Sequence, residues 1–276
     1  EPLYEDICAA MQHADKKVSV LACRYGLSSK DVPPASIHAV FRNMISLQPK
    51  NHVTLGIIDD VTHLSIPDVP IAIHTEGTVN CKFWGFGSDG TVGANKNSIK
   101  IIGDNTDMYV QAYFEYDTKK SGGVTKSHLR FGKHPIRATY YIKEADFLAC
   151  HKQAYMDSYD IVSEVKEGGI FLLNCSWKGE ELERHLSNKV KQQLAEKKIR
   201  FYTIDATKIA EEIGLGSNRT NTVLQAAFFQ LTHILPIDHA VKYMKDAIAK
   251  TYLAKGEQVI AMNQAAVDEG IKGITA

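Results

Sequence analysis

Residues 79–96 read VNCKFWGFGSDGTVGANK and change from strand-like to helix-like character within a few positions. The apolar run Val79–Trp84 predicts a buried strand, the glycines that follow predict a tight turn, and Thr91–Gly103 predicts a helix. A strand that passes through glycines into a helix is the opening unit of a Rossmann-like α/β sheet. We therefore expect such a domain to begin near residue 76.

The turn itself suggests a ligand. Gly85–Gly90 matches the pattern G-x-G-x-x-G, in which glycines bring backbone N–H groups close to a ligand at the positive end of a helix. Such a turn suits a diphosphate or another compact anion. Lys96 could add positive charge, whereas the carboxylate of Asp89 repels phosphate unless it binds a ribose, an amide or a hydroxyl. The same turn could also serve only to pack the helix against the strand.

Downstream of this turn, strand-like and helix-like segments alternate. We expect strands over Tyr109–Tyr116, Val124–Phe131, Ile136–Ile142, Phe147–Cys150, Ile170–Cys175 and Ile199–Asp205. We expect helices over Met156–Glu167, Gly179–Lys198, Thr220–Ile234, Asp238–Tyr252 and Glu257–Gly270. This alternation predicts an α/β fold, a Rossmann-like parallel or mixed sheet with helices on both faces.

Upstream of the turn, the pattern predicts part of a smaller α/β domain. A helix over Leu3–Asp15 precedes a β-α-β unit made of Val18–Cys23, Ala35–Ser46 and His52–Ile58. Residues 59–76 hold two prolines and no clear period, which is typical of a linker. We place the domain boundary near residue 75.

Composition excludes several classes of protein. Lys plus Arg (32) equals Asp plus Glu (32), so no basic field exists to hold nucleic acid, and no apolar run is long enough to span a membrane. The five cysteines lack C-x-x-C spacing, which argues against a disulfide framework and against an iron–sulfur cluster. Cysteines without disulfides are typical of a reducing compartment, so we expect a cytoplasmic protein. The first residue is not Met, so we expect a piece of a longer chain.

Seven motifs, taken together, resemble pyruvate:ferredoxin (flavodoxin) oxidoreductase. They are RYGLSSK (24–30), GIIDDVTH (56–63), GFGSDGTVGANK (85–96), KIIGDNTD (100–107), KKSGG (119–123), SHLRFG (127–132) and NTVLQAAFF (221–229), in order over most of the chain. The resemblance implies an internal fragment. Residues 1–75 would be the C-terminal part of a transketolase-C-like domain II plus linker, and residues 76–276 the gamma-type domain III.

The family oxidises pyruvate to acetyl-CoA and passes electrons to ferredoxin or flavodoxin, so the resemblance implies a part of an oxidoreductase. It also implies that this piece binds coenzyme A, while thiamine diphosphate, magnesium and iron–sulfur clusters belong to other domains. The family's GDG thiamine motif is not matched by Gly103-Asp104-Asn105. The implied partners are the other domains, a second subunit of a dimer and the electron carrier, with no nucleic acid or membrane.

Carried over motif by motif, the resemblance assigns coenzyme A contacts and no catalytic residue. The contacts are Gly87, Ser88, Asp89, Gly90, Thr91, Val92, Gly93, Lys96, Lys119, Lys120, Arg130, Arg219 and Asn221. Several have a simpler alternative: Lys119 and Lys120 could be solvated, Arg130 could form an internal salt bridge, and Asn221 could be a helix N-cap. His63, His74, His128 and His134 lack zinc-like spacing, and we expect them at surfaces or interfaces. Cys175 is expected to be an inert thiol.

Two other interpretations stay open. The glycine-rich turn could hold NAD, although Glu115 and Asp117 lie further along the chain than the acidic residue of that motif usually does. Alternatively, the turn could lack a ligand and the chain could be a structural or interaction module of the same enzyme. We expect the isolated chain to bind coenzyme A weakly and to turn over nothing.

Overall fold

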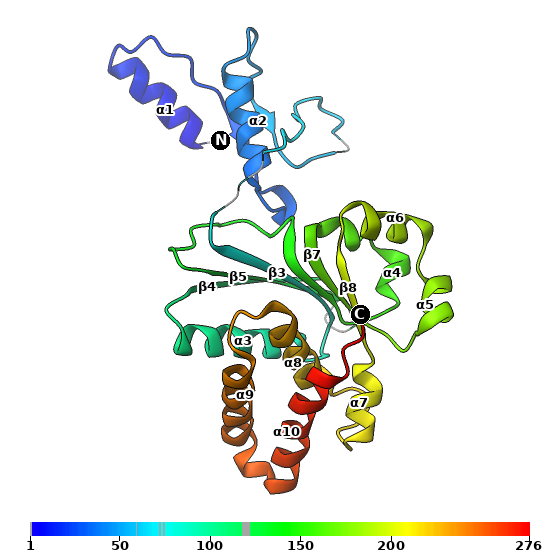
Figure 1. Ribbon diagram of the computed structural model, residues 1–276. Coiled ribbons are helices and arrows are strands. Elements are labelled where there is room, and N and C mark those ends of the chain that lie inside the picture. Colours follow the sequence, from blue (N-terminus) through cyan, green and yellow to red (C-terminus); the bar gives the residue numbers. More distant parts are fainter. Residues whose placement is uncertain (1, 59, 72, 74, 118–121) are drawn as a thin grey trace. The chain divides into compact units, whose positions relative to one another are not determined.

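The computed structural model describes residues 2–58, 60–71, 73, 75–117 and 122–276. The chain forms two compact units, Glu1–Thr75 with Ala138–Tyr141, and Glu76–Arg137 with Ile142–Ala276 (Figure 1). Within the first unit, the backbone N–H of Tyr141 donates to the carboxylate of Asp31 at 3.1 Å.

The first unit contains a minimal parallel β-α-β arrangement. Its elements are α1 (Pro2–His13), β1 (Cys23–Arg24), η1 (Leu27–Ser29), α2 (Pro34–Met44) and β2 (Val53–Thr54). Both strands are shorter than expected. Before β1, the N–H of Ala22 donates to the side chain of Asn51 at 2.7 Å, and within β2 the N–H of Thr54 donates to Leu64 O at 3.0 Å.

The second unit is built on one mixed sheet. Its strands are β3 (Thr78–Phe86), β4 (Tyr109–Tyr116), β5 (Val124–Gly132), β6 (Ala145–Cys150), β7 (Val165–Asn174) and β8 (Arg200–Ile204). They lie in the order β4-β5-β3-β6-β7-β8. Strands β3, β6, β7 and β8 are mutually parallel, whereas β5 runs antiparallel to both β3 and β4.

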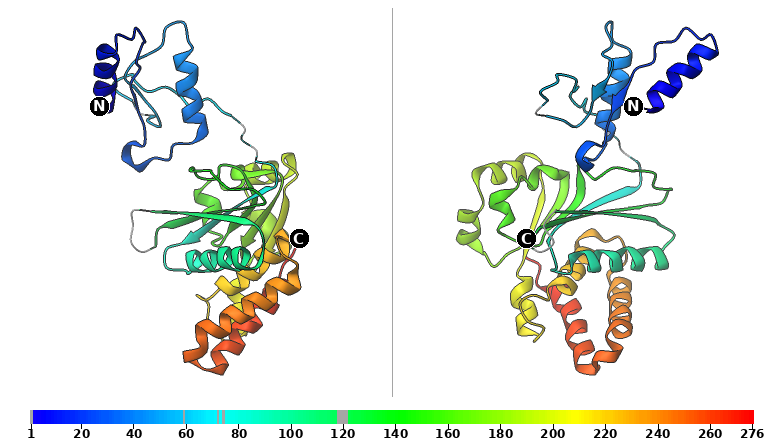
Figure 2. Two further views of the ribbon diagram at one scale, coloured as in Figure 1. Left: turned by 90° about the vertical axis from the view of Figure 1, so that its left-hand side faces the viewer. Right: turned by 180° about the vertical axis from the view of Figure 1, so that it is seen from behind.

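Helices cover both faces of this sheet (Figure 2). They are α3 (Thr91–Asn105), α4 (Tyr155–Ser158), η2 (Val162–Glu164), α5 (Gly179–His185), α6 (Asn188–Glu196), α7 (Ala206–Glu212), α8 (Asn221–Thr232), α9 (Ile237–Tyr252), η3 (Leu253–Lys255) and α10 (Glu257–Lys272). In β6, Phe147 and Ala149 face one core with α3, α8, α9 and α10, while Leu148 and Cys150 face a second core with α4 and α6. This strict alternation of buried side chains confirms the predicted fold class.

Three of the elements predicted downstream of the glycine-rich turn are wrong in detail. No strand forms over residues 136–142, because a strand needs a paired neighbour and the described residues provide none there. The predicted helix Met156–Glu167 ends at Ser158, and Val165 begins β7 by pairing with Ala145. The apolar spacing in this segment reflects Ile161 and Val162 turned into the second core.

The predicted helix Gly179–Lys198 is two helices. Leu186 is extended between α5 and α6, and the Ser187 hydroxyl caps α6 by accepting the N–H of Val190 at 3.3 Å. Helix α7 was not expected. It begins after Asp205, whose side chain accepts the N–H of Lys208 at 3.0 Å.

A glycine sets how closely α8 and α10 approach. A Cβ on Gly270 would lie 2.5 Å from the carbonyl oxygen of Val223 and 3.0 Å from the Cβ of Ala226. Gly270→Ala is therefore expected to lower the free energy of unfolding by about 1–3 kcal/mol, since overpacking outweighs the better helix propensity of alanine. Urea unfolding measures this change. A stability equal to or above that of the wild type would contradict it.

Candidate functional site

The helices that follow the neighbouring strands β3 and β6 pack on opposite faces of the sheet. Helix α3, which follows β3, packs in the first core through Ile101 and Ile102, whereas α4, which follows β6, packs in the second core through Tyr155 and Met156. Helices that leave neighbouring parallel strands toward opposite faces open a crevice at the carboxyl ends of those strands, and ligands of α/β sheets bind there. The glycine-rich turn lies at this point (Figure 1).

Backbone contacts hold the turn in a tight, left-handed shape. Gly87 N–H donates to Gly123 O at 2.8 Å, and Asp89 N–H donates to Phe86 O at 2.9 Å. Ser88 and Gly90 have φ values of 74° and 84°. Only glycine adopts such values without strain, so the sequence pattern at Gly90 has a direct physical cause.

The side chain of Asp89 stabilises the turn from within. Its carboxylate accepts the N–H of Phe86 at 2.8 Å, the N–H of Thr91 at 2.7 Å and the hydroxyl of Thr91 at 2.8 Å. Thr91 is 0 % exposed. Both side chains are therefore bonded within the turn, and neither is free to contact a ligand directly.

Four backbone N–H groups of the turn and of the first helical turn have no hydrogen-bond partner within the described part of the chain. They belong to Ser88, Gly90, Val92 and Gly93. They stand at the N-terminus of the fifteen-residue helix α3, where the helix dipole adds partial positive charge. This array can donate to phosphate, carboxylate or amide oxygens.

Asn221 joins the turn from a distant part of the sequence. As the first residue of α8, it donates from Nδ2 to the carbonyl oxygen of Asp89, and a Cβ on Gly90 would lie 2.3 Å from that nitrogen. Its Oδ1 is buried and has no partner among the residues described. The N-cap of α8 is Thr220, so the interpretation of Asn221 as the cap is wrong.

The structure does not bring all of the remaining predicted contact residues to the turn. Arg219 is exposed directly before α8, and Lys96 is exposed on α3 with its Nζ 5.4 Å from the ring centre of Phe114. Lys119 and Lys120 lie outside the described residues. Of the predicted contact residues that the structure describes, only those of the turn and Asn221 are in contact with each other.

Arg130 is not brought to the turn. It is 4 % exposed and donates to Gln111 Oε1 at 2.8 Å. It pairs with Asn80, whereas Phe86 at the turn pairs with Val124. Six positions along the strand (86 − 80) correspond to roughly 20 Å at about 3.3 Å per residue. Arg130 therefore does not share a phosphate site with Gly87–Gly93.

His151 is a neighbour of the turn that the sequence did not single out. It directly follows β6, and its Nδ1 lies 2.7 Å from the Thr91 hydroxyl oxygen. The ring also packs edge-on against Phe83, with centroids 6.1 Å apart. Burial lowers the pKa of His151, and the nearby charge of Asp89 only partly opposes this shift. The signal that could have found it is a polar residue directly after a predicted parallel strand.

A crevice of about 440 Å³ continues from His151 along the carboxyl ends of β6, β7 and β8. Its lining residues are His151, Lys152, Gln153, Asn174, Cys175, Ser176, Asp205, Thr207, Lys208 and Glu211. Burial raises the pKa of Cys175 to about 11, so the thiol is protonated at neutral pH and is a poor nucleophile. The crevice can bind but holds no activated cysteine.

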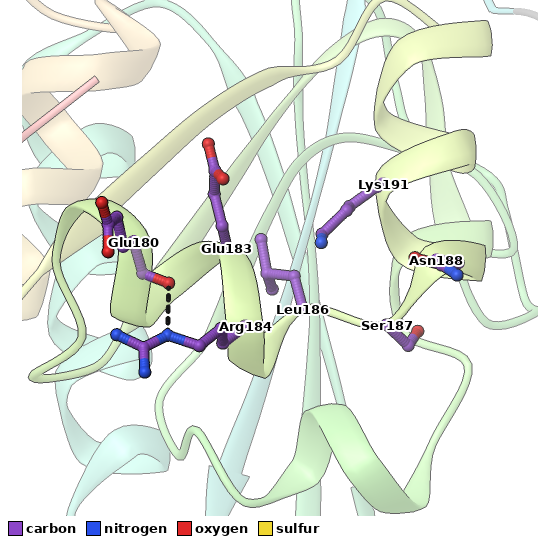
Figure 3. A pocket seen from close by; sticks show the side chains of 7 residues that line it. All are labelled: Glu180, Glu183, Arg184, Leu186, Ser187, Asn188 and Lys191. Carbon is purple, nitrogen blue, oxygen red and sulfur yellow. Dashed lines mark hydrogen bonds between the residues drawn. The ribbon is translucent and has the colours of Figure 1, made fainter.

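A second hollow, of about 600 Å³, is an open surface depression between α5 and α6 (Figure 3). Its lining residues are Glu180, Glu183, Arg184, Leu186, Ser187, Asn188 and Lys191. Arg184 Nε already donates to Glu180 O at 3.3 Å, and most of the other lining side chains are polar and exposed. We assign no site to it.

The histidines were expected at surfaces or interfaces, which is wrong for His128. His128 is buried at 1 % exposure on β5, 3.5 Å from Glu115, while His74 lies outside the described residues. Within the described ranges, no group of three or more His, Cys, Asp or Glu side chains is arranged to hold a metal ion. In the same ranges, no helix has the length and apolar character needed to cross a membrane.

Comparison with known proteins agrees with this fold. Residues 80–273 match the family model described as pyruvate ferredoxin/flavodoxin oxidoreductase. The pyruvate:ferredoxin oxidoreductase of Moorella thermoacetica is 53% identical over 276 residues, which cover 99% of this chain and 23% of that protein. This chain thus spans about a quarter of the length of that relative.

Two solved structures share the fold at low sequence identity. The pyruvate oxidoreductase subunit PORC of Thermotoga maritima has a TM-score of 0.57 at 20% identity, covering 72% of this chain and 98% of that one. The 2-oxoglutarate:ferredoxin oxidoreductase of Magnetococcus marinus has a TM-score of 0.55 at 18% identity, covering 73% and 32%. Because the family model matches the chain from β3 to α10 and the Moorella protein is 53% identical, the chain belongs to the pyruvate ferredoxin/flavodoxin oxidoreductase family.

Proposed function

We propose that this chain is the piece of a pyruvate:ferredoxin or pyruvate:flavodoxin oxidoreductase that binds and orients coenzyme A. The observation that carries the proposal is the set of N–H groups at Ser88, Gly90, Val92 and Gly93, which have no partner among the described residues and lie at the carboxyl edge of the sheet. These groups suit the diphosphate of the coenzyme. The buried Oδ1 of Asn221 beside them has no partner in the described part of the chain, and it fits a ligand that offers a hydrogen-bond donor.

The proposed contribution of this piece is positioning. When bound, coenzyme A supplies the thiol that accepts the acyl group. The residues of this chain hold the remote part of the molecule, and this binding energy brings the thiol to the reaction centre. The Magnetococcus relative has coenzyme A and succinyl-CoA bound, which supports the assignment.

The rest of the reaction is proposed to occur outside this piece. The chain corresponds to 23% of the Moorella relative, so thiamine diphosphate, magnesium, the iron–sulfur clusters and the contact with ferredoxin or flavodoxin are assigned to the remaining domains and to a second subunit. Cys81, Cys150 and Cys175 are free thiols, which supports a cytoplasmic location.

NAD is less well supported as the ligand. A Rossmann site takes its ribose-binding acid from the end of the parallel strand next to the first one. Here the strand that follows α3 is β4, which lies at the edge of the sheet and is separated from β3 by β5. Glu115 on β4 is already bonded to Lys126 at 3.0 Å. The topology therefore favours coenzyme A over a dinucleotide.

Isothermal titration calorimetry of the chain tests the proposal. Coenzyme A is expected to bind weakly and NADH not at all, with no pyruvate-dependent reduction of viologen. Asn221→Ala is expected to weaken coenzyme A binding about tenfold, because it removes both the clamp on Asp89 and a ligand contact. Asn188→Ala is the matched control, since Asn188 occupies the equivalent first position of α6.

Two outcomes would count against this function. Absence of coenzyme A binding by the wild-type chain would overturn it outright. An unchanged affinity of Asn221→Ala for coenzyme A would mean that the coenzyme binds away from the turn. Lys119→Ala combined with Lys120→Ala then decides whether the KKSGG segment holds the phosphates.

A further inference from the structure

The backbone of His151 is fixed between two neighbouring strands. Its N–H donates to Trp84 O on β3 at 2.9 Å, and its carbonyl oxygen accepts Asn174 Nδ2 from the end of β7 at 3.0 Å. Asn174 Oδ1 in turn accepts the N–H of Ala206 at 3.0 Å. The ring therefore projects from a rigid part of the sheet edge, as a residue that orients a ligand must.

Counting protons on Thr91 assigns the tautomer of the His151 ring. The hydroxyl oxygen lies 2.8 Å from Asp89 Oδ2 and 2.7 Å from His151 Nδ1, yet a hydroxyl carries one proton. A carboxylate only accepts, so that proton points to Asp89. The contact with the ring is then a hydrogen bond only if Nδ1 carries a proton and donates it to Thr91.

The other ring nitrogen is consequently an acceptor. Burial lowers the pKa of His151, so the ring is neutral at pH 7 and carries a single proton, on Nδ1. Nε2 has no hydrogen-bond partner among the residues that the structure describes, and the His151 side chain is only partly buried. It is therefore accessible, on the wall of the crevice that His151 lines.

The crevice suits a neutral group rather than phosphate. Two lysines, Lys152 and Lys208, are balanced there by Asp205 and Glu211. The ammonium of Lys152 is further engaged 4.0 Å above the ring of Phe86. A charge-balanced polar crevice does not select an anion, whereas the N–H groups of the adjoining turn do.

We propose that His151 Nε2 is the hydrogen-bond acceptor that positions a neutral, N–H-bearing part of the ligand in this crevice while its phosphates contact the glycine-rich turn. This inference rests on the proposed function, because coenzyme A offers such N–H groups in both its adenine and its pantetheine arm. His151 is thus a positioning residue for the ligand. Thr91 and Asp89 act through it by fixing which nitrogen is free.

The tautomer is measured directly by long-range ¹H–¹⁵N NMR on the ¹⁵N-histidine-labelled chain at pH 7. An Nδ1–H ring is expected that disappears in His151→Phe. In Thr91→Val, which keeps the volume of the buried side chain but removes the hydroxyl, the same ring is expected to change to Nε2–H. An Nε2–H ring at His151 in the wild type would overturn the inference.

Ligand fragments measure the role in binding. His151→Phe, which keeps an aromatic ring against Phe83, is expected to weaken coenzyme A binding about three- to tenfold, and Lys189→Ala is the control outside the crevice. A loss confined to adenosine 3′,5′-bisphosphate places adenine at His151, and a loss confined to 4′-phosphopantetheine places the pantetheine arm there. Unchanged affinity for coenzyme A in a folded His151→Phe chain would overturn this inference alone, whereas no binding by the wild type would overturn the proposed function.

Discussion

Replacing Glu164 by alanine is expected to lower the free energy of unfolding of the second unit by about 3–5 kcal/mol. Glu164 binds Lys82 Nζ at 2.7 Å and accepts Trp84 Nε1 at 2.9 Å. The side chain of Lys82 is 4 % exposed, and its pKa is lowered by burial despite the attraction of Glu164. Without Glu164, a buried ammonium keeps mainly the carbonyl oxygen of Ile142, at 3.4 Å.

Two further variants separate charge burial from simple loss of contacts. Lys82→Met combined with Glu164→Gln removes both charges and retains an acceptor for the indole, so it is expected to recover most of the stability. Lys189→Ala breaks the exposed pair with Asp160 and is expected to change stability by about 0.5 kcal/mol or less. Urea unfolding followed by tryptophan fluorescence reports on this unit, because both tryptophans, Trp84 and Trp177, lie in it. A loss below about 1 kcal/mol in Glu164→Ala would contradict the prediction.

Gly90→Ala is expected to damage both stability and binding. The residue has φ 84°, which costs alanine about 1–2 kcal/mol, and the added Cβ would lie 2.3 Å from Asn221 Nδ2. Asn221 must then move and release the carbonyl oxygen of Asp89. We expect a loss of about 2 kcal/mol or more in the free energy of unfolding and at least a tenfold loss of coenzyme A affinity.

The same turn supplies the control for this change. A Cβ on Gly93 would meet no atom within 4 Å, so Gly93→Ala is expected to keep stability or raise it by up to about 1 kcal/mol. Adding Asn221→Ala to Gly90→Ala should cost little more, because the clash and the hydrogen bond involve the same side chain. If Gly90→Ala is as stable as Gly93→Ala, the close contact between the turn and α8 is refuted.

Much of the fold could be predicted because its signals are local. The strand β4 was predicted with its observed bounds, and β3, α3, α8, α9 and α10 within a few residues, because apolar spacing and glycines act over neighbouring positions. The predicted helix Met156–Glu167 was wrong because its end depends on a distant partner. Val165 extends β7 because Ala145 is beside it, and no local pattern reveals that neighbour.

The candidate site also has a part that the sequence predicts and a part that only the tertiary structure shows. The sequence alone determined the strand, turn and helix around Gly85–Gly90, because a left-handed backbone and an open helix N-terminus are properties of a short segment. Only the tertiary structure decided which side chains surround that turn. It brought Asn221 to Asp89 and His151 to Thr91, and it left Arg130 far along the strand. For His151 the physical reason is the strand order, since the parallel pairing of β3 with β6 brings it to Thr91, 60 positions away, and no local pattern connects the two.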